Sequence, residues 1–126
     1  MKQFAFPRTS RLRLKREFEA VFDAGHKAAT ADLVAWHSGS PDREKKLGLM
    51  VSKKTGGAVK RNRLKRLLRE AFRLDKRELK EGTRLIIYPK AGCAVGNLAQ
   101  ARKALDAVRR RARLNDDGGK DRFEKS

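Results

Sequence analysis

The sequence predicts a single α+β domain in which helices pack on a small β-sheet. Three observations predict it: the chain has 126 residues, its apolar residues recur at helical or alternating spacing in turn, and Gly or Pro separates several of these segments. A chain of this length builds one hydrophobic core rather than two. We place the domain at residues 1–115, with an irregular basic arm at 1–13, and expect residues 116–126 to be a disordered polar tail.

The first half of the chain predicts a helix followed by strands. Apolar residues at 14, 18, 21 and 22 predict a helix at 15–24, which Gly25 can close in the left-handed conformation. The segment 29–38 contains β-branched and aromatic residues without Gly or Pro, which indicates a strand. Alternating apolar residues indicate a second strand at 47–53.

The second half predicts a helix, a strand and a last helix. Residues 60–73 have helical spacing, residues 84–90 form an apolar strand ended by Pro89, and residues 97–113 carry apolar residues at intervals of three and four. The path from the strand at 47–53 to the next strand runs through a helix. This crossover allows the two strands to be parallel neighbours.

The composition points to a polyanionic partner. Lys and Arg number 33 against 15 acids, which gives a net charge of +18 and an isoelectric point near 11. Nucleic acid is the first candidate and an anionic membrane the second.

The single cysteine, Cys93, excludes an intramolecular disulfide and a cysteine-based metal site. We expect a cytoplasmic protein, since the sequence has neither an N-terminal signal peptide nor an apolar stretch long enough to span a membrane.

The segment KRNRLKRLLREAFR, residues 60–73, has seven Lys or Arg residues and predicts a two-faced helix. Its apolar side consists of Leu64, Leu67, Leu68, Ala71 and Phe72, and its polar side of Asn62, Lys65, Arg66, Arg69 and Arg73. Such a charged side is often only solvated surface, but this one repels itself because Glu70 is its single acid. The excess of Arg and the preceding Thr-Gly-Gly favour phosphate binding.

The run KKTGGAVKRNRLKRLLREAF closely resembles the signature of the protein subunit of bacterial ribonuclease P. The resemblance extends over about residues 8–113 and includes the helix with Phe18, Val21 and Phe22, the segment LGLMVSKK and the segment RLIIYPK. It implies a two-layer α/β sandwich similar to domain two of ribosomal protein S5, in the order αβββαβα. It also implies a left-handed crossover through the basic helix, against the general preference for right-handed ones.

The resemblance also implies a function and its residues. The expected partners are ribonuclease P RNA, with one protein per RNA, and precursor tRNA, from which the holoenzyme removes the 5′ leader. The RNA is expected to carry the chemistry with Mg²⁺, without a catalytic or metal-binding residue in this chain. The residues expected to face the RNA are Lys53, Lys54, Arg61, Asn62, Arg63, Lys65, Arg66 and Arg69. Those expected to line a cleft for the single-stranded leader are Phe18, Phe22 and Trp36, the last at a position where the family often has Tyr.

Alternatives remain open at this stage. Phe18 and Phe22 lie on the apolar side of their helix, so they are equally well explained as core residues. His26 and His37 are isolated in the sequence, which argues against a metal site or a general base. The composition fits a structural RNA-binding protein, such as a ribosomal protein, equally well. Adsorption to a membrane through the basic helix is a weaker alternative, because the core needs its apolar side.

Overall fold

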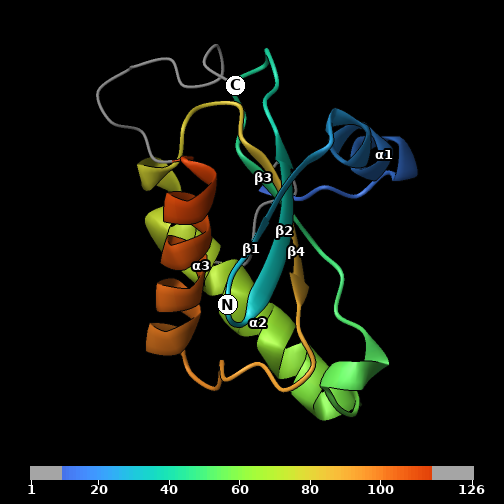
Figure 1. Cartoon of the computed structure of the whole chain (residues 1–126), viewed down its shortest axis with the longest axis vertical. Coiled ribbons are helices and arrows are strands. Elements are labelled where there is room, and N and C mark those ends of the chain that lie inside the picture. The colour runs from blue at the N-terminus through green and yellow to red at the C-terminus, as the bar shows by residue number, and fades with distance from the viewer. Residues whose placement is uncertain (1–9, 115–126) are drawn as a thin grey trace, which may run out of the picture.

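The computed structural model describes residues 10–114, and in these the predicted order αβββαβα is confirmed (Figure 1). The elements are α1 (Lys15–Ala24), β1 (His26–Ala29), β2 (Leu33–Ser38), β3 (Lys46–Leu49), α2 (Ala58–Asp75), β4 (Arg84–Pro89) and α3 (Leu98–Ala112). Short 3₁₀ turns, η3 (Lys53–Thr55) and η4 (Lys76–Glu78), flank α2. The first nine residues of the predicted arm, the predicted domain end at 115 and the tail at 116–126 lie outside the described residues.

The four strands form one mixed sheet in the order β1-β2-β4-β3. The pairs β1–β2 and β2–β4 are antiparallel, whereas β3 and β4 are parallel neighbours, as the crossover through α2 had suggested. Parallel strands need such a crossover because the end of one strand and the start of the next lie at opposite ends of the sheet, measured along the strands. The left-handed sense of this connection stays a prediction. The crossover helix α2 packs against α3 and also contacts β3.

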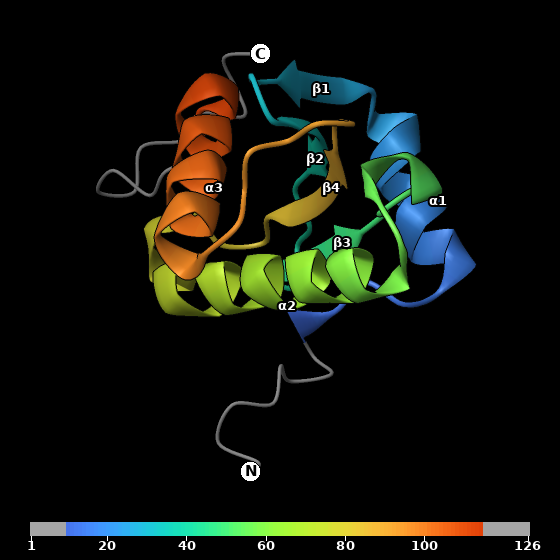
Figure 2. The same ribbon diagram turned by 90° about the horizontal axis from the view of Figure 1, so that it is seen from below.

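Helices cover the sheet on both faces (Figures 1 and 2). On one face α2 and α3 pack side by side, and their apolar residues join alternate residues of the strands in the main core. Leu33, Leu68 and Ile87 in this core are essentially inaccessible to solvent. On the other face α1 packs on β2 and β4 over a smaller cluster. The two faces thus differ in how completely they are covered.

Two strand predictions need correction. The prediction of a single strand at 29–38 is wrong, because a tight turn separates β1 from β2 at residues 30–32. The Thr30 amide donates to the Leu33 carbonyl at 2.8 Å, and Thr30 Oγ1 accepts a hydrogen bond from the Leu33 amide. A hydroxyl can close such a turn without the Gly or Pro that would mark it in the sequence.

The predicted strand at 47–53 is too long at its C-terminal end, since β3 ends at Leu49. Ser52 instead caps the 3₁₀ turn η3, where its hydroxyl accepts a hydrogen bond from the Lys54 amide. The other elements were predicted well: α1 and α3 lie within one residue of their expected bounds, β4 begins at Arg84, and α2 extends two residues further at each end. Gly25 does close α1 in the left-handed conformation, with φ of 77°.

Candidate RNA interface

The basic helix α2 has the two sides that its sequence predicts. Leu64, Leu68, Ala71 and Phe72 are buried against the sheet and α3. The residues expected to face RNA lie outside this core; Asn62, Arg63 and Arg66 are exposed, and Arg61, Lys65 and Arg69 are half-buried. Both acids of α2 are held in ion pairs, Glu70 with Arg73 and Asp75 with Arg102. The remaining charge on the outer side of α2 is therefore basic.

One flank of α2 lies next to strand β3. Arg61, Lys65 and Arg69 follow one another at intervals of four residues and so lie along one line of the helix. Burial lowers the pKa of Arg69, and the nearby charge of Arg11 lowers it further. Arg11 itself is held beside β3 by a bridge to Leu47. Two positive charges therefore lie close together on this flank of α2.

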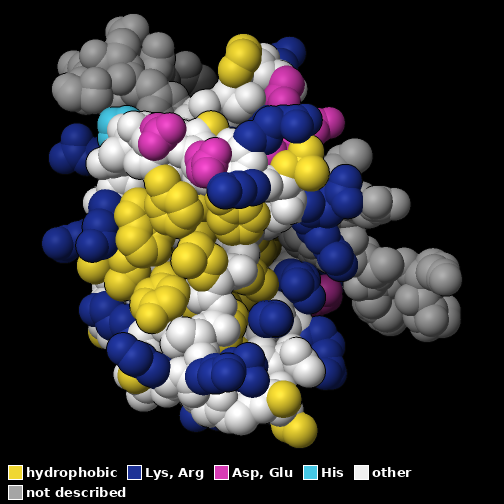
Figure 3. Space-filling model, turned by 90° about the vertical axis from the view of Figure 1, so that its right-hand side faces the viewer, with side chains coloured by type: hydrophobic (Ala, Val, Ile, Leu, Met, Phe, Trp, Pro, Cys, Tyr) yellow, Lys and Arg dark blue, Asp and Glu magenta, His cyan; other side chains and the backbone are white. Residues whose placement is uncertain are grey.

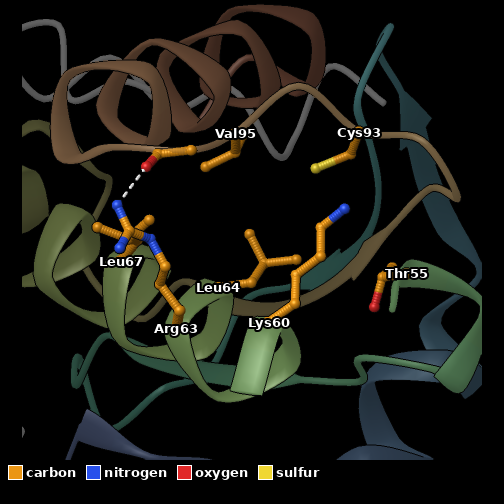
Figure 4. Close-up of a pocket in the computed structure, with 8 residues that line it drawn as sticks. Thr55, Lys60, Arg63, Leu64, Leu67, Cys93 and Val95 are labelled. Atoms are coloured by element: carbon orange, nitrogen blue, oxygen red, sulfur yellow. Dashed lines mark hydrogen bonds between the residues drawn. The ribbon is translucent and has the colours of Figure 1, made fainter. Parts of the chain in front are cut away.

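The other flank of α2 borders a cavity of about 200 Å³ between the helix and the β4–α3 loop (Figure 4). Arg63 reaches across its end, and its Nη2 donates to the Gly96 carbonyl at 2.8 Å. Lys60 borders the same cavity, opposite Cys93 and Val95. Arg61 and Arg63 thus lie on different flanks, and the residues expected to face RNA surround the outer half of α2 instead of forming one line.

The N-terminal end of α2 is open to a ligand. Its cap residue, Gly57, provides no side-chain hydrogen bond, and there is open space where a Cβ would be. Backbone N–H groups of the first turn therefore keep their capacity to bind an anion. Lys53 and Lys54 are exposed on η3 just before this end. A phosphate-facing end at Thr-Gly-Gly stays a prediction.

The three aromatic residues expected to bind the leader come together on the α1 face of the sheet. Phe18, Phe22 and Trp36 are all half-buried and pack against Leu12, Val21 and Ile86. The rings of Phe22 and Trp36 meet edge to face, with centroids 5.2 Å apart. These rings are neither fully enclosed nor free in solvent. They combine a packing role with an accessible aromatic surface, so neither of the two readings that the sequence left open describes them completely.

The aromatic face includes further residues that were not predicted from the sequence. Because successive strand residues alternate between faces, Val34 and Tyr88 lie on the same face as Trp36, and they are paired across β2 and β4. Both are half-buried. Lys27 places its ammonium 5.5 Å from the centre of the Trp36 ring. Alternation along RLIIYPK would have assigned Tyr88 to this face, but only the pairing of β2 with β4 brings it beside Trp36.

The aromatic face and the basic residues form a continuous surface. Figure 3 views the molecule from the side of α1 and shows hydrophobic side chains gathered in one patch, with Lys and Arg side chains along most of its border and acidic side chains at its upper edge. Phe18 lies close to the sheet because Gly48 of β3 has no side chain: a Cβ there would be 2.7 Å from the Phe18 ring. A single strand of nucleic acid can stack bases on such rings while its phosphates meet the surrounding cations.

Comparison with known proteins decides the family. The family model for ribonuclease P matches residues 6–113. The chain belongs to the ribonuclease P protein family. It is 35% identical over 118 residues to the ribonuclease P protein component of Desulfovibrio desulfuricans, covering 90% of this chain and 91% of that protein. It is 43% identical over 76 residues to that of Geotalea uraniireducens, covering 60% of this chain and 67% of that protein.

Solved structures agree with this membership. The ribonuclease P protein of Staphylococcus aureus superposes with a TM-score of 0.75 at 26% identity, covering 85% of this chain and 98% of that one. That of Thermotoga maritima gives a TM-score of 0.70 at 30% identity, covering 79% and 96%. The chain accordingly has the role of protein subunit in ribonuclease P, a tRNA-processing endoribonuclease, and it works with ribonuclease P RNA. No helix within residues 10–114 is long and apolar enough to cross a membrane.

Proposed function

We propose that this chain binds ribonuclease P RNA through α2 and η3 and holds the 5′ leader of precursor tRNA on the aromatic face. One observation carries the proposal: the accessible rings of Phe18, Phe22 and Trp36 lie on a face that is bordered by basic side chains. Phosphates dominate the affinity of proteins for RNA, whereas rings select unstacked bases. The two kinds of surface therefore suit a structured RNA and a single-stranded segment at the same time.

In this proposal the RNA subunit carries out the hydrolysis, using Mg²⁺ that the RNA holds. The carboxylates of α2 support this division of labour, because Glu70 and Asp75 are engaged by Arg73 and Arg102. Mg²⁺ prefers oxygen ligands such as free carboxylates, whereas the outer side of α2 presents guanidinium and ammonium groups. The role of the chain is then to neutralise phosphates, so that the RNA and its substrate approach one another at lower Mg²⁺. One protein per RNA and a cytoplasmic location complete the proposal.

Reconstitution tests this assignment. The chain should restore cleavage of precursor tRNA by a bacterial ribonuclease P RNA at low Mg²⁺, and it should be inactive by itself. Substrates with a 5′ leader should bind more tightly than mature tRNA when the protein is present. No stimulation of the RNA, or equal affinity for the two substrates, would contradict the proposed role.

The variant Arg66→Ala tests the RNA-binding side of α2. Arg66 is exposed and has no acidic partner among residues 10–114, so its removal should leave the fold intact and weaken RNA binding. The dependence of log K on log salt should become shallower by roughly 0.7–0.9 for each phosphate that the variant no longer neutralises. Lys103→Ala on α3 removes the same charge from an exposed site outside α2 and serves as the control. If Arg66→Ala and Lys103→Ala changed the salt dependence by the same amount, the RNA would not bind specifically at the outer side of α2.

A further inference from the structure

A second group of basic residues lies at the opposite edge of the sheet. A shallow pocket of about 420 Å³ is lined by residues of β1 and of the C-terminal end of α3. Figure 2 shows these two segments at the same end of the molecule. The residues that line the pocket include His26, Lys27, Ala29, His37, Arg111 and Arg113. Strands β1 and β3 are the two edges of the sheet, so this pocket is separate from the α2 flank beside β3.

The two arginines of this pocket differ from the other arginines of α3. Arg102 pairs with Asp75, and Arg109 and Arg110 both pair with Asp106. Arg111 and Arg113 are exposed, and within residues 10–114 neither is paired with an acidic side chain. Two guanidinium groups at one pocket, with no acidic partner among residues 10–114, favour an anion that they can bind together.

His37 adds a buried ring nitrogen to the pocket. Its residue is only 9% exposed, and among the described residues its Nδ1 has no hydrogen-bond partner. Its ring stacks on the exposed ring of His26, with centroids 5.4 Å apart. Burial, followed by the neighbouring His26, lowers the pKa of His37 to about 4, so its imidazole is neutral at pH 7. A neutral imidazole still has one N–H to donate, and leaving a buried nitrogen unpaired is unfavourable.

The edge of β1 supplies backbone donors. Hydrogen-bonded and non-hydrogen-bonded pairs alternate along an antiparallel ladder. The hydrogen bond from the Thr30 amide to the Leu33 carbonyl therefore shows which residues of β1 direct their amides toward β2. By this alternation the amides of Lys27 and Ala29 point away from β2, toward the open edge. The Lys27 ammonium lies over Trp36 on the α1 face, so Lys27 contributes its main chain to the pocket.

We propose that this pocket is a second phosphate-binding site, in which Arg111 and Arg113 bind the phosphate oxygens and the His37 imidazole donates to one of them. The phosphate belongs either to the backbone of a bound RNA or to a free phosphate compound. A cationic ligand does not fit, because the two arginines repel it. The site does not depend on the role proposed for α2, since the two lie at different edges of the sheet.

Proton NMR of the histidine rings tests the site directly. The intact chain is titrated with inorganic phosphate at constant ionic strength, with chloride as the balancing anion. The ring signals of His26 and His37 should shift to saturation, and the pKa of His37 should rise above its value of about 4, because a bound anion stabilises the imidazolium. Ring signals and a His37 pKa that phosphate leaves unchanged would overturn the proposal.

Single-residue variants distinguish phosphate binding at this pocket from a general effect of net positive charge. Arg111→Gln should weaken phosphate binding by about tenfold, the effect of losing one charge-assisted hydrogen bond. Arg113→Gly should do the same without disturbing the helix end, because Arg113 has φ of 59° and glycine favours that conformation. Lys103→Gln, on the same helix but outside the pocket, should leave binding unchanged. Equal weakening by Lys103→Gln would show that only net charge matters.

A short single-stranded RNA without terminal phosphates identifies the source of the phosphate. If this RNA shifts the His26 and His37 signals and Arg111→Gln abolishes the shift, the site binds the RNA backbone. If only inorganic phosphate shifts them, the site binds a free phosphate compound. Arg66→Ala should leave the phosphate-induced shifts intact in either case, so a failure of the role proposed for α2 is distinguishable from a failure of this site.

Discussion

The two faces of the sheet are built from the same strands but are covered to different degrees. On the α2–α3 face, Leu33, Leu68, Leu85 and Ile87 are at most 1% exposed, and two long helices enclose them. On the α1 face, only Leu12, Val21 and Ile86 of the cluster are buried, while Phe18, Phe22 and Trp36 remain half-exposed. A single ten-residue helix is too short to cover four strands.

Because of this difference, the closed face mainly stabilises the fold and the half-covered face is available for binding. A closed core gains free energy from every apolar atom it removes from water, whereas a half-covered face leaves aromatic surface for a ligand. Lys and Arg side chains form most of the border of the same α1 face, which suits a polyanionic strand with unstacked bases (Figure 3). Substitutions on the two faces should therefore have different consequences.

Leu68→Ala tests the closed face and should have the largest effect. The side chain is 0% exposed, and its truncation should lower the free energy of unfolding by about 2–5 kcal/mol. Chemical denaturation measures this decrease. Val59→Ala on the same helix is the control, because Val59 is 84% exposed and its truncation should change stability by less than about 0.5 kcal/mol. Similar decreases in the two variants would contradict a closed core.

Phe22→Ala tests the open face. Its half-buried ring should contribute about 2 kcal/mol to stability, less than the roughly 3–5 kcal/mol of a fully enclosed Phe. Affinity for precursor tRNA with a leader should fall by about 1–3 kcal/mol if one base stacks on this ring. Affinity for mature tRNA is the internal control. A decrease of stability alone would return Phe22 to the role of a core residue.

Gly48→Ala changes the open face without removing a ring. The new Cβ would lie 2.7 Å from Phe18, so the ring has to shift. We expect a destabilisation of about 1 kcal/mol, at the low end for overpacking, because the tip of a side chain can move. Leader affinity should fall together with it. Unchanged leader affinity, with the ring displaced, would show that Phe18 does not contact the leader.

Glu17→Gln tests how α1 is held on the open face and should have the smallest effect. Burial alone would raise the pKa of Glu17, but hydrogen bonds from the Arg13 and Leu14 amides and the Lys46 ammonium lower it to about 2. A lowered pKa means that the charged carboxylate stabilises the fold fully above its ordinary value of 4.5, and that this stabilisation disappears as the pH falls toward 2.

The stability difference between the original chain and Glu17→Gln should thus be about 1 kcal/mol at neutral pH, allowing for solvent screening, and should vanish near pH 2. Thermal melting across this pH range measures it. Glu19→Gln removes only an exposed ion pair with Lys15 and is the control, which should change stability by less than about 0.5 kcal/mol. A difference that persists at pH 2 would mean that the Glu17 charge is not what holds α1.

Local patterns were enough to predict much of this protein. The spacing of apolar residues located α1, α2 and α3, because a helix repeats every 3.6 residues whatever it packs against. The same spacing assigned Leu64, Leu68 and Phe72 to the core and Arg66 to the outer side, as the structure places them. The hairpin at Thr30 was missed, because a side-chain hydroxyl closes it without a residue typical of turns.

The tertiary structure decided which residues from distant parts of the chain lie next to one another. Spacing along one segment cannot show that Tyr88 pairs with Val34, that Phe18 rests on Gly48, or that Arg63 bonds to the carbonyl of Gly96. The pocket at the β1 edge likewise joins His26 and His37 to Arg111 and Arg113 from the far end of the chain. The sequence by itself determined the elements, their buried sides and the excess of positive charge, since these depend on neighbours within one or two turns. The arrangement of those charges and rings into surfaces depends on strand order and helix packing, which are set by contacts between residues far apart in the chain.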